Sequence, residues 1–302
     1  MITNDPSPFA NQPPGTEVLI DQQTPPPTPT APAPPSAWWE FFKALIAWVG
    51  SVMALLLVPL LLIVPYLIYL VTTKGALSAD VLTQDKMFIL LSIIGVIPAH
   101  LVTLFIAWAV VTNWRRLPFW KTLGFSWPPT VAPWIGFGIC FLIAITLLGA
   151  GLLITHFLGG GKTDLDKLIE SSFQARVATA IVAVATAPLV EEIIYRGILY
   201  PAIQRLIGVV GGIAVVSIMF AGVHVLQYRN NIGVILVITI LSVTLTTIRA
   251  TSGRLLPSVV VHLIFNGLQS LYLVLEPFIT KPEKVEPAPA LLAIIRVFHH
   301  FF

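Results

Sequence analysis

The chain has 302 residues, 56% of them hydrophobic and only 10% charged, and its mean hydropathy is +0.89. Because a soluble domain carries about 25% charged residues, this composition excludes an ordinary soluble protein and indicates a polytopic membrane protein. The net charge of +3 comes largely from short loops between apolar stretches. With no extended basic patch on a soluble domain, nucleic-acid binding is excluded. The single cysteine, Cys140, excludes an internal disulfide and is expected to serve packing.

Residues 1–37 contain eleven of the 25 prolines. They show neither a positively charged beginning nor an apolar stretch, so they do not resemble a signal peptide. We expect a disordered, proline-rich tail that acts as a solvated spacer.

Apolar runs of about 20 residues, long enough to cross the ~30 Å hydrocarbon layer of a bilayer, recur along the rest of the chain. They are continuous rather than alternating, which excludes a membrane β-barrel. The sequence therefore predicts an all-α fold, a polytopic transmembrane bundle of about seven to eight helices in the lipid bilayer. The expected spans lie near residues 41–72, 87–112, 133–157, 177–203, 208–228, 232–250 and 255–275.

These spans suggest a division into parts. Residues 38–175 would form the N-terminal helices and a polar loop, in which residues 159–176 form an exposed helix or lid. Residues 176–278 would form a functional core, and residues 279–302 an interfacial segment, because its apolar run is too short to span. The terminal pair His299 and His300 is expected to lie at the headgroup level. The loops on the two sides of the membrane hold six lysines and arginines each, so the distribution of positive charge does not determine the orientation of the chain in the membrane.

Two adjacent carboxylates, Glu191 and Glu192, are the only acidic residues between Glu170 and Glu276. A charge near the centre of a bilayer costs at least about 2.5 to 3.5 kcal/mol, so an acid placed there indicates a functional site. On a helix, Glu192 and Arg196 are four residues apart and can form an ion pair. Glu191 lies about 100° around the helix from Glu192 and can face a different cavity.

Polar residues on later spans lie at depths that allow them to meet Glu191: His224, His262 and Asn266. Each taken alone has a structural explanation, since a membrane histidine can bond a neighbouring backbone and an asparagine can join two helices. Taken together with Glu191 they favour a functional site. His100, beside Pro98 on the second span, has no visible carboxylate partner and is expected to be structural.

The order of these residues also matches a known pattern. From about Thr179 to Gln269 the sequence resembles the core of the CPBP family, which comprises CAAX prenyl endopeptidases and bacteriocin-processing intramembrane proteases. The resemblance covers less than a third of the chain. It rests on three motifs in order: Glu191-Glu192-x-x-x-Arg196, Phe220-x-x-x-His224 and His262-x-x-x-Asn266.

The resemblance implies a role for each residue. Glu191 would be the base that activates a water, and His224 would assist it. His262 and Asn266 would stabilise the oxyanion of the tetrahedral intermediate, while Glu192 and Arg196 would orient the site. This agrees with the needs of amide hydrolysis, namely a water activator and hydrogen-bond donors aimed at the oxyanion.

Metal dependence stays open. The zinc-protease motif His-Glu-x-x-His is absent. Glu191, His224 and His262 could supply three ligands to a divalent metal such as zinc. The resemblance allows both a metalloprotease and a metal-independent, glutamate-dependent hydrolase.

The sequence thus predicts a multi-pass membrane endopeptidase that cleaves a membrane-associated protein or peptide, of which a prenylated CAAX-type substrate is one example. Two other classes stay open. A transporter or proton relay would also place glutamate and histidine inside the membrane, although the two halves show no convincing internal repeat. A non-catalytic scaffold or immunity-type protein could be built on the same core.

Overall fold

The computed structural model describes residues 36–75, 78, 82, 84–161 and 163–280, and within these ranges all regular structure is helical. The predicted all-α membrane bundle is confirmed. Six described stretches are long and apolar enough to cross a membrane. The predicted tail and the predicted C-terminal segment, with His299 and His300, lie almost entirely outside the described residues. The six stretches are 37–73, 86–112, 133–158, 173–228, 232–252 and 256–279.

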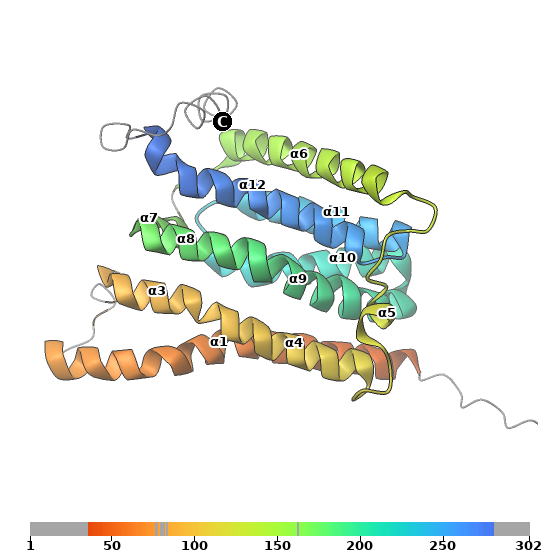
Figure 1. Cartoon of the computed structure of the whole chain (residues 1–302), viewed down its shortest axis with the longest axis horizontal. Helices are drawn as coiled ribbons and strands as arrows, with labels where there is room; N and C mark the ends of the chain where they lie inside the picture. Colours follow the sequence, from red (N-terminus) through yellow and green to blue (C-terminus); the bar gives the residue numbers. More distant parts are fainter. Residues whose placement is uncertain (1–35, 76–77, 79–81, 83, 162, 281–302) are drawn as a thin grey trace, which may run out of the picture. The chain divides into compact units, whose positions relative to one another are not determined.

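The first two spans pack against each other as α1 (Ala37–Lys74), α3 (Lys86–Ile94) and α4 (Val96–Thr112) (Figure 1). The second span is interrupted at Gly95, three residues before Pro98. A proline lacks an N–H and clashes with the carbonyl four residues earlier, so the helix breaks on its N-terminal side. A Cβ at Gly95 would lie 3.0 Å from the Cα of Pro59, so this glycine also permits close contact with α1.

A short helix, α5 (Phe119–Leu123), leads to α6 (Pro133–Leu158), which packs against α11 (Ile232–Ser252) and α12 (Leu256–Thr280). Cys140 is buried in the apolar cluster between these three helices, where it serves packing. The predicted polar loop contains α7 (Asp164–Glu170), which begins with a capping box at Thr163.

Residues 173–228 form one apolar helical run with two π-helical turns. It breaks at Gly208, where φ is 78° and ψ is 177°. A Cβ at Gly212 would lie 3.3 Å from the Cα of Gln204, so the two arms pack against each other. The predicted boundary between the fourth and fifth spans lies at this turn. The elements of the run are α8 (Phe173–Ile181), η1 (Val182–Thr186), α9 (Ala187–Glu192), η2 (Ile193–Leu199) and α10 (Tyr200–Tyr228).

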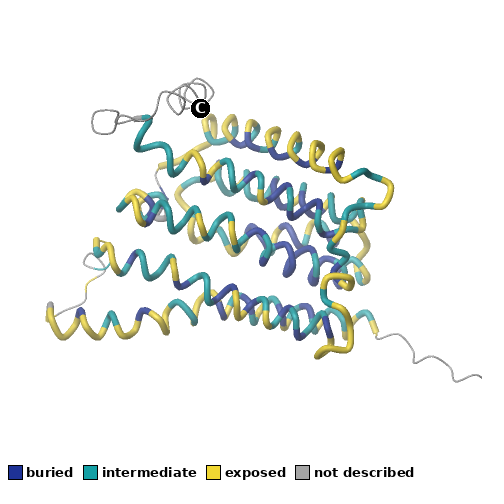
Figure 2. Tube along the Cα trace, viewed as in Figure 1, coloured by how far each residue is buried: buried dark blue, intermediate teal, exposed yellow. Residues whose placement is uncertain are grey.

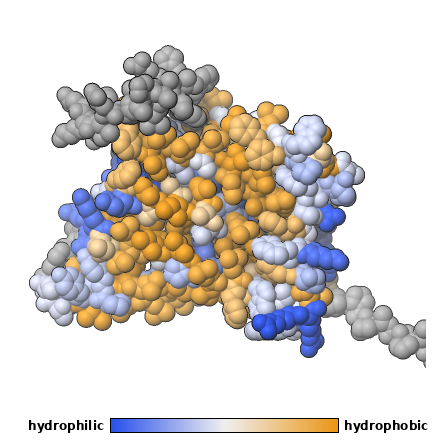
Figure 3. Space-filling view, in the orientation of Figure 1, coloured by the Kyte–Doolittle hydropathy of each residue, from blue (hydrophilic) through white to orange (hydrophobic). Residues whose placement is uncertain are grey.

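Buried residues and hydrophilic residues are distributed unevenly over the helices. The most continuously buried residues run from α9 through η2 into the beginning of α10 (Figure 2). Apolar side chains cover the middle of the visible face, and hydrophilic residues gather toward the two ends of the helices (Figure 3). A helical bundle in a bilayer requires this distribution, because its middle contacts hydrocarbon and its ends contact headgroups and water.

Candidate functional site

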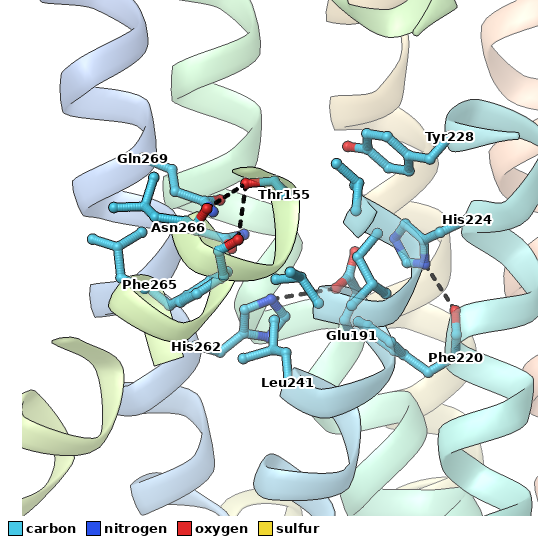
Figure 4. Close-up of a pocket in the computed structure, with 16 residues that line it drawn as sticks. Thr155, Glu191, Phe220, His224, Tyr228, Leu241, His262, Phe265, Asn266 and Gln269 are labelled. Atoms are coloured by element: carbon cyan, nitrogen blue, oxygen red, sulfur yellow. Dashed lines mark hydrogen bonds and ion pairs between the residues drawn. The ribbon is translucent and has the colours of Figure 1, made fainter. Parts of the chain in front are cut away.

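A cavity of about 220 Å³ lies among α6, α9, α10, α11 and α12. The four predicted catalytic residues, Glu191, His224, His262 and Asn266, all line it, although they come from three different helices (Figure 4). Further residues on its wall are Leu148, Gly151, Leu152, Thr155, Phe220, Tyr228, Val234, Val237, Ile238, Leu241, Phe265 and Gln269.

The two adjacent glutamates point to different surroundings, as their 100° separation predicts. The Glu191 side chain is 24% exposed and faces the cavity, whereas Glu192 and Arg196 are fully buried. Arg196 Nη1 donates to Glu192 Oε1 over 2.9 Å. The other guanidinium nitrogens donate to Thr246 Oγ1 over 3.2 Å and to the hydroxyl of Ser242 over 2.6 Å. The guanidinium is closely hydrogen-bonded, whereas Glu192 Oε2 is buried without a hydrogen-bond partner among the described residues, so the contacts of Arg196 and of Glu192 Oε1 stabilise this buried pair.

His262 lies between the two glutamates. Its Nδ1 is 3.0 Å from Glu192 Oε1, and its Nε2 is 3.7 Å from Glu191 Oε2. A carboxylate only accepts hydrogen bonds, so Nδ1 carries the hydrogen that is donated to Glu192. The buried glutamate therefore fixes the orientation of the ring and directs Nε2 toward Glu191.

His224 is fixed in the same way by a backbone group. Its Nδ1 donates to the carbonyl of Phe220 over 2.8 Å, which leaves Nε2 as the acceptor of the neutral ring. The Phe220 ring lies 4.9 Å from the ring of His224 and 6.2 Å from that of His262, measured between centroids. Its other neighbours are Arg196, 4.6 Å from the ring centroid, and Tyr195 in an edge-on contact. This phenylalanine supports both histidines.

Asn266 contacts the π-helical turn that precedes the glutamates. Its Nδ2 donates to the carbonyl of Ala183 over 3.0 Å. In η1 the Ala187 N–H bonds the carbonyl five residues earlier, that of Val182. The next donor in this register would be residue 188, but Pro188 has no N–H. Asn266 thus supplies the donor that the proline cannot.

Three polar residues of the cavity were not predicted: Thr155, Tyr228 and Gln269. Tyr228 follows His224 by four residues and Gln269 follows Asn266 by three, so helical spacing could have identified both. Thr155 lies on α6, and no predicted catalytic residue lies on this helix from which helical spacing could have identified it. In Figure 4, Thr155, Asn266 and Gln269 lie on one side of the cavity, opposite Glu191 and His224.

The three predicted metal ligands, Glu191, His224 and His262, lie on three different helices. In the described part of the chain, no group of three or more histidines, cysteines, aspartates or glutamates is placed to hold a metal ion. Glu191, His224 and His262 share a cavity but do not meet as a ligand set.

Residues 173–268 match the model of the Rce1-like family, described as type II CAAX prenyl endopeptidase Rce1-like. The match supports membership of the CPBP family, and it contains Glu191, His224, His262 and Asn266. The searches of curated proteins and of solved structures found no match. The family match and the six apolar stretches define the chain as a multi-pass integral membrane protein, and the family is one of CAAX-type intramembrane proteases.

Proposed function

We propose that the protein is an intramembrane endopeptidase in which Glu191 activates a water molecule for attack on a peptide bond. The observation that carries the proposal is the placement of His262 between the two glutamates. One ring nitrogen bonds the buried Glu192, and the other lies 3.7 Å from the cavity-facing Glu191. A base and an oriented polar partner thus face the same space, as general-base hydrolysis requires.

In the proposed reaction, Glu191 accepts a proton from water while the water oxygen attacks the peptide carbonyl carbon. The carbonyl oxygen becomes an oxyanion. As the tetrahedral intermediate collapses, the carbon–nitrogen bond breaks and Glu191 returns the proton to the leaving amine. The products are a new carboxyl terminus and a new amino terminus.

The neighbouring residues divide the remaining tasks. His224 Nε2 accepts a hydrogen bond from the water and holds it near Glu191. His262 and Asn266 donate to the oxyanion. For this role His262 must carry a hydrogen on both nitrogens, because its Nδ1 hydrogen is already donated to Glu192. One amide hydrogen of Asn266 bonds Ala183, which fixes the direction of the second. Removing one oxyanion donor from a hydrolase costs about 10²- to 10³-fold in rate.

The substrate we propose is a membrane-associated protein or peptide. The cavity is lined by apolar side chains of the spans, such as Leu241 and Phe265, which suits an apolar, membrane-associated substrate. The printed description of the family names CAAX prenyl endopeptidases. A prenylated, CAAX-type carboxyl terminus is accordingly the first substrate class to test.

The decisive experiment measures cleavage of prenylated and matching unprenylated peptides by the purified protein in detergent, with mass spectrometry of the products. We expect one new carboxyl terminus in the wild type and none in Glu191→Ala. Cleavage that survives this substitution, or no cleavage of any peptide in the panel, would overturn the proposal. Proton flux coupled to a transported solute, without proteolysis, would establish the transporter instead.

A further inference from the structure

We propose that His100 is a positioning residue for Glu191, although it belongs to an N-terminal helix outside the segment that matches the family model. The inference rests on the proposed function for its catalytic consequence. Its structural part, the fixing of the turn that precedes Glu191, stands on geometry alone. His100 lies on α4 and is 4% exposed.

The contact joins two distant segments. His100 Nδ1 lies 2.8 Å from Thr186 Oγ1, across 86 residues of sequence. The Thr186 hydroxyl also donates to the carbonyl of Val182 over 3.2 Å. A hydroxyl has one hydrogen to donate, so in this arrangement Thr186 Oγ1 accepts the Nδ1 hydrogen of His100. The histidine thereby fixes the Thr186 hydroxyl, whose hydrogen bond joins the last residue of η1 to its first.

Thr186 is the point at which the π-helical turn gives way to α9. Its φ of −124° and ψ of −46° depart from helical values, unlike those of Ala187, which follows. Glu191 lies five residues further along, on α9. The direction of the first turn of α9 depends on this junction and sets the direction in which Glu191 enters the cavity.

The turn is held from two sides. His100 of α4 bonds Thr186 at its end, and Asn266 of α12 bonds the carbonyl of Ala183 near its beginning. π-Helical turns are rare and frequently lie at functional sites. These two contacts keep η1 in a fixed geometry, so α4 helps to build a site to whose cavity lining it contributes no residue.

A displacement of about 1 Å in a catalytic group can lower a rate 10²-fold. We therefore expect His100→Phe and Thr186→Val to lower kcat by about 10- to 100-fold while KM changes less than threefold. The conservative variants His100→Asn, which keeps a donor at the Nδ1 position, and Thr186→Ser should restore most of the loss. The double variant His100→Phe/Thr186→Val should be no slower than the worse single variant, because both remove the same contact.

Thr103 provides the matched control. It is a buried threonine on the same helix, 1% exposed, and its hydroxyl has no hydrogen-bond partner among the described residues. Thr103→Val should cleave like the wild type. Equal losses in His100→Phe and His100→Asn, or wild-type kcat in Thr186→Val, would overturn the catalytic part of the inference.

A second readout works without any cleavage assay. Hydrogen–deuterium exchange of the full-length protein in detergent should show faster uptake across residues 182–192 in His100→Phe and Thr186→Val, and unchanged uptake in Thr103→Val. Unchanged uptake in the first two variants would overturn the inference. Faster uptake in a protein that cleaves no peptide would leave the positioning contact standing and remove only the proposed protease function.

Discussion

The Nδ1 of His262 donates to Glu192 while its Nε2 faces Glu191, so two consecutive glutamates address opposite nitrogens of one imidazole ring. The 100° step of the helix makes this arrangement possible, because it directs one carboxylate into the core and the next into the cavity. The buried carboxylate thus orients the ring, and the cavity-facing one is the base of the proposed reaction.

Replacing Glu191 by Gln should lower kcat by about 10²- to 10⁴-fold, the range that general-base catalysis contributes. The Glu191 side chain is partly exposed, and its ion-pair contact with His262 Nε2 is 3.7 Å long, so loss of its charge should leave the melting temperature in detergent near that of the wild type. Glu40→Gln is a control, because Glu40 forms a partly exposed pair with Lys43 far from the cavity in sequence. Equal activity of the Glu191 and Glu40 variants would contradict this assignment.

Replacing Glu192 by Ala should instead affect stability. The substitution leaves the fully buried Arg196 without its counter-charge, and breaking such a pair costs about 3 to 5 kcal/mol. We expect a lower melting temperature in detergent and less folded protein at 25 °C. Arg205→Ala, at an exposed arginine on the same hairpin, should melt like the wild type. An unchanged melting temperature for Glu192→Ala would show that the pair does not support the fold.

A substitution at Pro188 can separate the two proposed roles of Asn266, namely the hydrogen bond to the Ala183 carbonyl and the hydrogen bond to the oxyanion. Asn266→Ala removes the donor to the Ala183 carbonyl and should destabilise the protein by about 1 to 3 kcal/mol. In a Pro188→Ala background, the new N–H at residue 188 can bond this carbonyl, so the stability cost of Asn266→Ala should shrink. Cleavage should stay low in the double variant if Asn266 also donates to the oxyanion. A stability cost that is the same in both backgrounds would refute the role of Pro188.

Chelation tests the metal question directly. Because the described residues form no three-ligand group, we expect cleavage to survive dialysis against a strong chelator. Atomic emission on the dialysed protein would establish the metal content. Loss of activity that is restored by one equivalent of zinc would contradict the expectation and show that the enzyme depends on a metal ion.

Much of the site could be predicted because its spacing lies within single helices. The four-residue interval between Glu192 and Arg196 predicts their pair, and the structure forms it. The position of His262 relative to both glutamates could not be predicted, since it depends on the packing of segments about 70 residues apart. Hydrophobic length identified the spans, and the boundary predicted between residues 203 and 208 lies at the turn at Gly208, although apolar residues continue through the break.

The π-helical turns and the contact of His100 were also beyond sequence reasoning. Pro188 predicts a disturbed helix, but the sequence does not determine whether the helix kinks or its hydrogen bonds change from the α-helical to the π-helical register. His100 was expected to be structural because no carboxylate accompanies it. Its partner is the hydroxyl of Thr186, a residue type too common in membrane helices to be distinctive.

The turn at Gly208 lies seventeen residues after Glu191 and sixteen before His224. The two arms of this hairpin therefore bring the glutamate and the histidine to nearly the same depth by residue count alone. A single inserted or deleted residue in either arm would shift one against the other by about 1.5 Å and rotate it by about 100°. The length of this part of the chain is therefore as much a part of the site as the residues that line the cavity.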